Sequence, residues 1–537
     1  MARKLQTQAN GNLTPSVIVR NWVGGEERDA TGGVRFDSRS ASNQVDVVGT
    51  APLSGMEDVE AACRAAAAAY PAWSATPAPV RGEIVGRIGE AISHHKELLS
   101  KLVCREIGKS MKESRGEVQE VIDTAHFFQS EGRRLYGQTV HSEMPNKELF
   151  TYRRSLGVAG MITAGNFPIA VPSWKILPAI LTGNTVVWKP SEDAPVIAYL
   201  FGRIMEEAGV PAGVVNIVHG AGGGGAGEAI LACVDKGLIQ KISFTGSTAV
   251  GRKVGEVCGR NLQIPSLELG GKNPMVVLRD ANIDVAVEGA LFSGYGTAGQ
   301  RCTSLGNLIL DKPIAAEFKA RLLKRLSEIK IGDVTKSEDV LYGPMINQRF
   351  YENFMKHFEM GKADGARLLT EKHGRITKEN APANFVGDPD AGYYVFPTLW
   401  EGVTADMKLS QTEIFGPVVT VMEVDGFAEA LAAANCAPYG LSSSCYTMNP
   451  TDILRFKNGI HAGMTSINNT TNGAEAHMPF GGVGWSGNGT RESGVWVIDA
   501  YTRWHAVNED LAGKLQLAQM DVDFGETKEP TDLSFLA

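Results

Sequence analysis

Two short motifs place residue types that could perform covalent chemistry 34 positions apart. Residues 267–274 set Glu268 between two leucines and ahead of two glycines, and residues 299–302 end in Cys302. A thiolate can attack a carbonyl carbon, and a carboxylate can activate the water that later releases the product. Together the two residues suffice to form a thioester and hydrolyse it.

Each residue also has a plainer interpretation. A single cysteine in a long chain is usually a small buried hydrophobe. Cys302 stands out because small residues surround it, and we expect backbone N–H groups and a nearby cation to lower its pKa. Glu268 could be an exposed acid at a domain junction. Its apolar neighbours favour a partly desolvated carboxyl with a raised pKa, which suits a general base. The glycines around the cysteine are Gly294, Gly296, Gly299 and Gly306.

The pattern of apolar residues predicts the helices and strands that must position these residues, and this pattern changes along the chain. Apolar periodicity predicts helices at 59–69, 81–107 and 114–135, and residues 138–154 read as an extended arm or hairpin. From residue 158 short apolar runs alternate with helices, which indicates a parallel sheet covered on both faces. The expected strands are 158–163, 184–188, 214–218 and 242–244, with helices at 194–208 and directly after 247.

A second α/β section follows Glu268. Its candidate strands are 274–278, 308–310 and 418–424, with helices at 284–293, 315–327 and 427–434. Residues 495–507 alternate again and could pair with the earlier arm. Because ligands bind parallel sheets at the carboxyl ends of the strands, the polar motifs fall where a site is expected.

Bulk properties narrow the class. At 537 residues the chain is long enough for roughly three domains. Its net charge of −8 argues against nucleic-acid binding. An odd number of cysteines, without a secretory signal or metal-ligand spacing, predicts reduced thiols in the cytoplasm and no metal site. The most apolar long stretch, 169–188, is interrupted by prolines and a lysine, so we expect no membrane span.

Taken with the motifs above, the chain resembles the NAD(P)-dependent aldehyde dehydrogenase superfamily over roughly residues 20–505. The resemblance implies an α/β fold with a Rossmann-type cofactor domain, an α/β catalytic domain and a β-arm for oligomerisation. It assigns the nucleophile to Cys302 and the base to Glu268. The side-chain amide of Asn166 and the N–H of Cys302 would form the oxyanion hole. The expected divisions are 1–137, 138–158, 159–267, 268–483, 484–507 and an extension at 508–537.

The cofactor motifs are individually weaker. Gly222 and Gly227 make only a loose phosphate loop, whereas Phe244, Gly246 and Ser247 lead into a helix whose N-terminus favours a pyrophosphate. The resemblance adds Lys189 and Glu192, which would hold the adenosine ribose. An acid there repels a 2′-phosphate, so NAD is preferred while NADP stays possible. Further cofactor contacts implied by the resemblance are Thr163, Leu269, Glu413 and Phe415.

The chain departs from the family pattern at two places, of which the first concerns a local contact near the subunit interface and the second the substrate channel. The usual lysine after the Pro-Phe-Gly-Gly motif is absent, and the loop 469–478 carries Glu475 and His477 in place of channel aromatics. Arg301 and Trp174 are expected to line the channel. The segment after Val507 could fold over the substrate entrance or a neighbouring subunit.

The resulting expectation is an NAD-dependent aldehyde dehydrogenase that acts on a small aldehyde as a homodimer or homotetramer, without nucleic-acid or membrane partners. A CoA-acylating relative is the nearest alternative, although such members generally lack the base at Glu268. A structural protein that keeps the fold without activity is the alternative from another class.

Overall fold

A seven-stranded sheet forms the core of the half of the molecule that contains most of the predicted cofactor-binding residues. The computed structural model describes residues 16–511, 513, 515, 517 and 529–536. The strand order is β12-β11-β8-β9-β10-β2-β3, and the first five of these strands are parallel. Their carboxyl ends therefore share one edge of the sheet. The parallel strands are β8 (Val158–Ile162), β9 (Thr185–Lys189), β10 (Val215–Ile217), β11 (Lys241–Thr245) and β12 (Ser266–Glu268).

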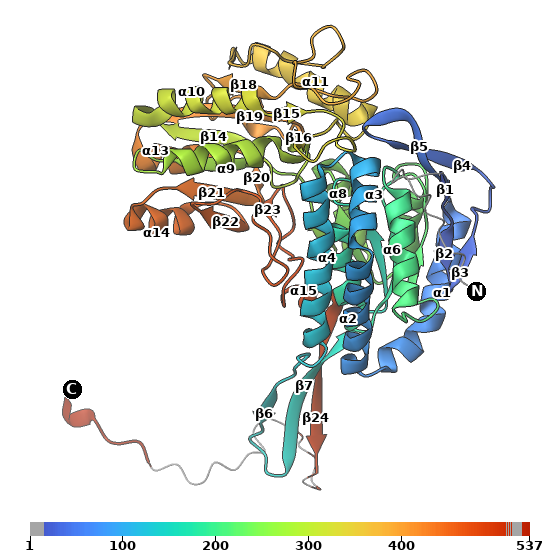
Figure 1. Ribbon diagram of the computed structural model, residues 1–537. Coiled ribbons are helices and arrows are strands. Elements are labelled where there is room, and N and C mark those ends of the chain that lie inside the picture. Colours follow the sequence, from blue (N-terminus) through green and yellow to red (C-terminus); the bar gives the residue numbers. More distant parts are fainter. Residues whose placement is uncertain (1–15, 512, 514, 516, 518–528, 537) are drawn as a thin grey trace.

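Helices cover both faces of this sheet, as the strand–helix alternation predicts (Figure 1). The predicted helix at 81–107 is wrong in one respect, because the chain turns at His95 and divides it into α2 and α3. The helices are α1 (Met56–Ala75), α2 (Ala78–His94), α3 (Lys96–Ile107), α4 (Met111–Glu131), α5 (Ala170–Leu181), α6 (Pro195–Glu207), α7 (Ala226–Asp235) and α8 (Thr248–Arg260).

The first 50 or so residues add strands that periodicity did not predict. β2 (Asn21–Val23) and β3 (Glu26–Arg28) extend the first seven-stranded sheet by antiparallel pairing, with Trp22 of β2 opposite Ile217 of β10. A separate three-stranded sheet contains β1 (Val17–Ile18), β4 (Arg35–Ser40) and β5 (Asn43–Pro52). Except for β5, these strands have six residues or fewer, so long-range pairing rather than local pattern decides them.

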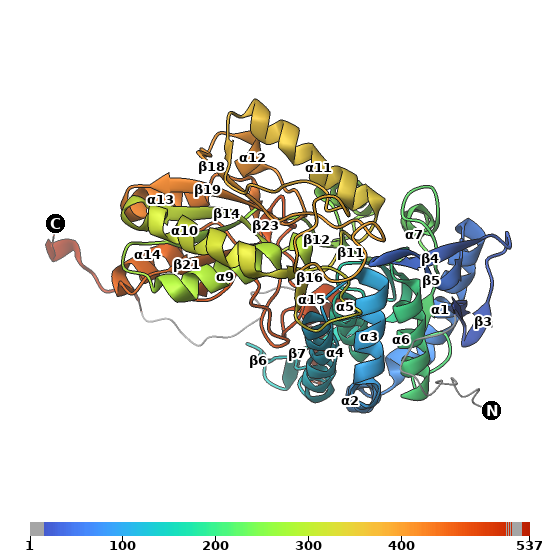
Figure 2. The ribbon, with the colours of Figure 1, turned by 45° about the horizontal axis from the view of Figure 1, so that its top comes forward.

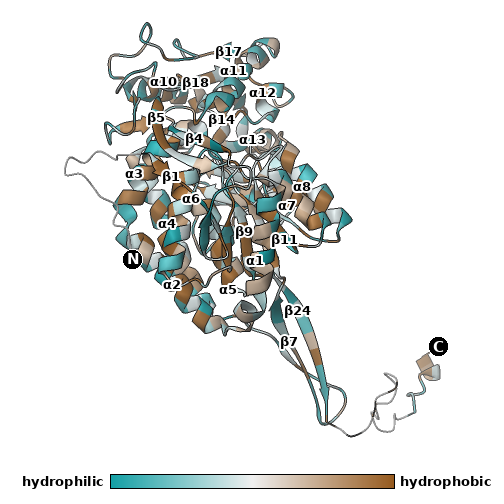
Figure 3. Ribbon diagram, turned by 90° about the vertical axis from the view of Figure 1, so that its right-hand side faces the viewer, coloured by the Kyte–Doolittle hydropathy of each residue, from teal (hydrophilic) through white to brown (hydrophobic). Residues whose placement is uncertain are grey.

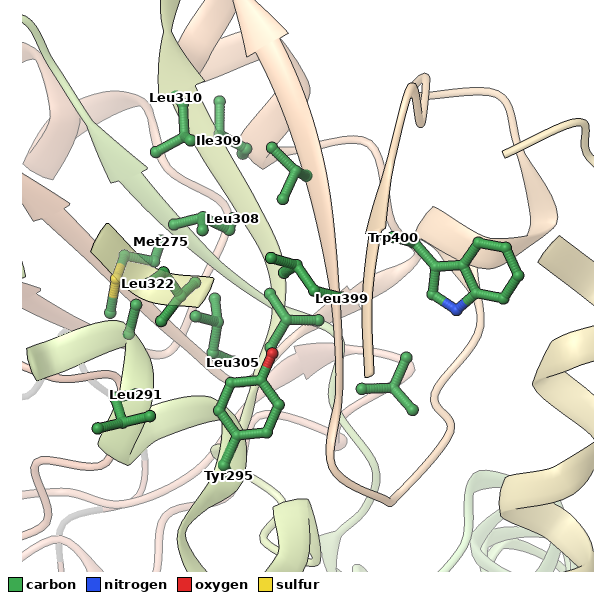
Figure 4. Close-up of a cluster of buried hydrophobic side chains, with 14 of the residues drawn as sticks. Met275, Leu291, Tyr295, Leu305, Leu308, Ile309, Leu310, Leu322, Leu399 and Trp400 are labelled. Atoms are coloured by element: carbon green, nitrogen blue, oxygen red, sulfur yellow. The ribbon is translucent and has the colours of Figure 1, made fainter. Parts of the chain in front are cut away.

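A second seven-stranded sheet follows Glu268 and packs beside the first half of the molecule (Figure 2). Its central strand β14 is buried at every position, and the three leucines and the isoleucine of β14 pack with Met275 and Tyr295 in the largest core (Figure 4). The sheet order is β17 (Arg367–Leu368), β18 (Thr398–Glu401), β19 (Val418–Val424), β14 (Leu305–Asp311), β13 (Asn273–Val277), β21 (Ser442–Tyr446) and β22 (Met464–Ile467).

Three helices of this half confirm the predictions at 284–293, 315–327 and 427–434, whereas the other three were not predicted. The helices are α9 (Ile283–Tyr295), α10 (Lys312–Glu328), α11 (Gln348–Ala363), α12 (Lys408–Gln411), α13 (Gly426–Ala434) and α14 (Pro450–Gly459). Two small pairs complete the half: β15 (Lys330–Ile331) with β16 (Val340–Tyr342), and β20 (Tyr439–Gly440) with β23 (Val483–Gly484).

An arm projects from the body, as expected (Figures 1 and 3). β7 (Lys147–Ser155) pairs on one side with β6 (Thr139–His141) and on the other with β24 (Thr502–Asp510). The antiparallel register runs from Thr502 opposite Ser155 to Asp510 opposite Lys147. The late segment therefore joins the arm, although its first part forms α15 (Val497–Tyr501) instead of a strand.

None of the helices in the described part of the chain combines the length and apolar character that a membrane crossing requires. The extension after Val507 lies partly outside the described residues. The apolar residues Leu511, Leu515, Leu517 and Phe535 are described, and all four are exposed. They do not line the pocket of their own chain, so the predicted cover over that entrance is not formed by them.

Candidate active site

Cys302 lies on a strained loop between α9 and β14. The chain passes through a turn of 3-10 helix (Gly296–Gly299) in which Thr297 and Ala298 have φ values of 50° and 52°. A left-handed conformation costs a residue with a side chain roughly 1–2 kcal/mol. Gly299 follows at φ 65°, and a Cβ there would lie 2.1 Å from the carbonyl oxygen of Gly416. Such strain persists only where surrounding contacts determine the loop.

Glu113 of α4 supplies several of those contacts. Its carboxylate accepts hydrogen bonds from the Thr297 N–H at 3.2 Å and the Thr297 hydroxyl at 2.9 Å, and it forms an ion pair with Arg301. Although burial opposes ionisation, Arg301 and then Lys109 lower the pKa of Glu113. The residue before the nucleophile is thus held by a charged, buried partner from the other half of the molecule.

Asn166 reaches the same loop from the end of β8. It is 6% exposed, and its Nδ2 donates a hydrogen bond to the carbonyl oxygen of Gln300 at 3.0 Å. An amide nitrogen carries two N–H groups, so one remains for a ligand. The structure therefore brings Asn166 and Cys302 together, as the oxyanion-hole hypothesis requires.

Glu268 ends β12, and it is 4% exposed, which excludes the interpretation as a surface acid. Neither of its carboxyl oxygens has a hydrogen-bond partner among the described residues. Burial, and then the charge of Glu492, raises its pKa well above the usual value, while Lys175 and Arg491 oppose the shift. The direction is the one that the flanking leucines predict. A buried carboxyl without partners is costly, and it fits a site that a water and a substrate complete.

The prediction for the thiol pKa is wrong. Burial, followed by the charges of Glu268 and Glu413, raises the pKa of the Cys302 thiol to about 12. The N–H groups of Cys302 and Thr303 act in the expected direction but are outweighed. Arg301, the cation next to Cys302 in the sequence, forms an ion pair with Glu113.

A pocket of about 260 Å³ opens on Cys302. Arg301 and Trp174 line it, as expected, whereas Glu475 and His477 do not. One face of α4 contributes a charged wall that includes Glu113 and Glu120. The remaining lining residues are Lys112, Gly116, Glu117, Phe167, Val171, Phe292, Thr303, Asn472, Ala474 and Phe480.

The predicted cofactor residues gather at the carboxyl edge of the first sheet. Lys189 ends β9, is buried, and its Nζ donates to Glu192 at 2.8 Å. Although burial opposes ionisation, Lys189 lowers the pKa of Glu192. Thr163 follows β8, and its hydroxyl accepts from the indole N–H of Trp188 at 3.0 Å. The Ser247 hydroxyl caps α8 by accepting from the Val250 N–H.

A groove of about 440 Å³ lies between α7 and α8, beside the glycine-rich loop. Small residues including Gly224, Gly225 and Ala229 line it, so a flat ring could enter. Gly227 lies so close to Gly222 that a Cβ would be 2.5 Å from the Gly222 carbonyl oxygen. The loop therefore requires glycine at 227, although neither Gly222 nor Gly227 lines the groove itself.

Five predicted cofactor residues remain: Phe244, Gly246, Leu269, Glu413 and Phe415. Glu413 accepts from the Gly271 N–H at 2.9 Å, and burial raises its pKa to about 7. Phe415 has a φ of 57°, and its ring lies 5.5 Å from the ring of Phe350. Leu269 packs on Gly251 of α8, and the ring of Phe244 lies against Gly246.

Sequence reasoning missed residues that lie outside the recognised motifs. Glu120 lies within the predicted helix 114–135 and Glu113 directly before it, and neither was given a role. The spacing of residues along a helix does not show which of its faces contacts a loop that is distant in the sequence. Asn273 was within a quoted motif but was given no role. Its position next to the Glu268 segment is a signal that could have found it.

The sequence model of the aldehyde dehydrogenase family matches residues 29–507, so the chain belongs to that family. It is 37% identical to an α-ketoglutarate semialdehyde dehydrogenase of Haloferax volcanii over 90% of this chain and 97% of the relative. It is 36% identical to an α-ketoglutaric semialdehyde dehydrogenase of Bacillus subtilis over 91% and 98%. A betaine aldehyde dehydrogenase of Staphylococcus aureus, solved in complex with NAD+, superposes with a TM-score of 0.87 at 29% identity, covering 95% of this chain and 97% of that one.

Proposed function

We propose that the protein is an NAD-dependent aldehyde dehydrogenase that oxidises an aldehyde to its carboxylic acid. The observation that carries this is the buried Glu268 carboxyl, which has no hydrogen-bond partner among the described residues. The Asn166 amide is hydrogen-bonded to the loop that carries the Cys302 thiol. Family membership supports the reaction class. The presence of a base favours hydrolysis of the thioester over transfer to a thiol such as CoA.

Each residue has a separate role. Cys302 Sγ bonds to the aldehyde carbon, and the Asn166 amide with the Cys302 N–H stabilises the oxygen that gains negative charge. NAD, when bound, accepts the hydride from the former aldehyde carbon. Glu268 then takes a proton from water, whose oxygen attacks the resulting thioester and releases the acid.

The residues present fit NAD. The α7–α8 groove offers small residues to an adenine ring, and the capped start of α8 suits a pyrophosphate. Lys189 and Glu192, at the edge of the same sheet, would hold the hydroxyls of the adenosine ribose, and Glu413 would contact the nicotinamide ribose. The charge of Glu192 disfavours a 2′-phosphate, so NAD is preferred to NADP. The related enzyme solved with NAD+ supports this choice.

We further propose a semialdehyde as the substrate class. Two of the relatives act on α-ketoglutarate semialdehyde by their names. The pocket agrees, because the Trp174 indole N–H and the Asn472 amide are buried donors without partners among the described residues. The Lys112 ammonium lies on the same wall. Donors of this kind would bind the carboxylate or keto oxygen at the far end of such a substrate.

The arm supports a homodimer or homotetramer. β24 is an edge strand, and unpaired strand edges are ready sites for pairing with another chain. The predicted domain divisions belong to the same proposal: the first sheet would be the cofactor domain and the second the catalytic domain, with residues near 268 between them. All seven cysteine thiols are free, which supports a reducing compartment such as the cytoplasm.

The test is a screen of aldehydes of varied length and charge with NAD and NADP, in the presence and absence of CoA. We expect NADH formation to be fastest with an aldehyde that carries a carboxylate, and the product to be the free acid. Cys302→Ser should abolish turnover. An acyl-CoA product, or turnover that survives the serine substitution, would reject the proposal.

A further inference from the structure

Asn273 joins the strand after Glu268 to the loop that carries Cys302. It is the first residue of β13 and is almost completely buried. Its Nδ2 donates to the carbonyl oxygen of Cys302 at 2.8 Å and to that of Ser304 at 2.8 Å. Its Oδ1 accepts from the Ser442 N–H at 2.9 Å. Both amide protons are thus used on the cysteine loop, and the acceptor is fixed by β21.

The backbone of the same motif is shaped around the same carbonyl group. A Cβ on Gly271 would lie 2.5 Å from the Cys302 carbonyl oxygen and 3.0 Å from the Asn273 amide. Only glycine therefore allows this approach without a shift. The pairing of β13 with β14 is irregular at this point, between Asn273 and Pro274, where the cysteine loop enters β14. The contact is built by the fold and is not a chance approach of two side chains.

These contacts hold the nucleophile from its C-terminal side. Asn166 holds the carbonyl oxygen of Gln300, two residues before Cys302, from the N-terminal side at 3.0 Å. Fixed carbonyls on both sides of Cys302 restrict its φ and ψ, and with them the directions of its N–H and its Sγ. Because Glu268 lies five residues before Asn273 in the same segment, the same bonds also relate the thiol to the base.

We propose that Asn273 is a positioning residue that orients the Cys302 thiol and N–H toward the substrate carbonyl. It touches no reacting atom and acts through the two peptide carbonyls that it binds. The inference rests on the proposed role of Cys302 as nucleophile. A displacement of the order of 1 Å at a reacting group can cost about 100-fold in rate, so a loss of these two bonds should be visible in catalysis.

The test compares two isosteric substitutions of buried asparagines. Asn273→Asp keeps the oxygen that accepts from Ser442 but replaces the double donor by an acceptor facing two carbonyls. Asn307→Asp on the neighbouring strand is the matched control. Asn307 is as deeply buried, and its Nδ2 donates at 2.8 Å to the carbonyl of Ser410 instead of to the carbonyls of Cys302 and Ser304. Asn273→Ser serves as a second variant, because it removes the donors without adding charge.

Three quantities should be measured: the melting temperature, kcat and KM, and the pH dependence of Cys302 alkylation by iodoacetamide without cofactor. We expect Asn273→Asp and Asn273→Ser to lower kcat by about 10- to 100-fold, to leave KM for NAD within about twofold, and to change the alkylation profile. Asn307→Asp should lower the melting temperature but leave the other quantities within about twofold.

Equal kinetic and alkylation effects at positions 273 and 307, or full kcat in both soluble variants at 273, would overturn the inference. If Asn273→Asp does not fold, the serine variant decides the outcome by the same measurements. Cys302→Ser separates this result from the proposed function. Turnover by the serine enzyme rejects the nucleophile itself, whereas an inactive serine enzyme with a fully active Asn273 variant rejects only the positioning role.

Discussion

Replacing Glu268 by Gln removes a proton acceptor while keeping the shape of the side chain. General base catalysis by a positioned group contributes about 10²–10⁴-fold. The variant should therefore lose about 3–5 kcal/mol of transition-state stabilisation in thioester hydrolysis. Thioester formation does not use this base, so the enzyme should still acylate. Rapid mixing with NAD and aldehyde should show one burst of NADH per active site, followed by turnover slowed by that factor.

The pH dependence gives a second readout. Since the pKa of Glu268 is raised, wild-type kcat should increase as pH rises through that value and the base becomes ionised. The profile of kcat for Glu268→Gln should lack this increase.

The stability of the fold should change with pH in the opposite direction to kcat. A raised folded-state pKa stabilises the protonated native form below the unfolded pKa, and the contribution is lost as pH rises, by about 1.4 kcal/mol per unit between the two values. The melting temperature of Glu268→Gln should consequently fall less with pH than that of the wild type.

Glu106→Gln provides the matched control. Glu106 is an equally buried carboxyl whose pKa burial raises to about 7, but it accepts from backbone N–H groups of α6 and from Ser38. Its loss should change stability without producing a burst. If Glu268→Gln turns over within threefold of the wild type, or forms no NADH in the first turnover, the assignment of the base is refuted.

Other expectations concern the oxyanion, the cofactor and the pocket wall. Asn166→Ala should reduce kcat by about 10²–10³-fold with little change in KM for NAD, and an unchanged kcat would exclude an oxyanion role. Glu192→Gln should raise the ratio of kcat/KM for NADP over NAD by roughly fivefold, the equivalent of about 1 kcal/mol for one partly exposed charge; no change would remove Glu192 from cofactor discrimination. Burial, then Glu117, raises the pKa of Glu120 to about 8. KM for an anionic aldehyde should accordingly rise above pH 8 as Glu120 ionises, and Glu120→Gln should flatten that profile; parallel profiles for both enzymes would contradict it.

Local pattern predicted the regular elements well. The buried runs that became β8, β9 and β14 are apolar at nearly every position, and the helices after them keep a clear period, so propensity and burial point the same way. Prediction was poorest for the polar N-terminal strands and for the end of the chain around α15. Pairing with distant strands, rather than the residues themselves, decides those segments.

The sequence by itself determined which reactive groups are present, namely one thiol among glycines and one carboxyl between leucines. It also indicated that the site lies at the carboxyl ends of the parallel strands. Only the tertiary structure decided the environment of each group. It placed the half-buried Cys302 near two carboxylates, so the thiol pKa rises instead of falling, and it paired Arg301 with Glu113. It also placed Asn273 against the cysteine loop. Desolvation and hydrogen bonding depend on which atoms surround a group in space, and that arrangement is set by contacts between residues far apart in the chain.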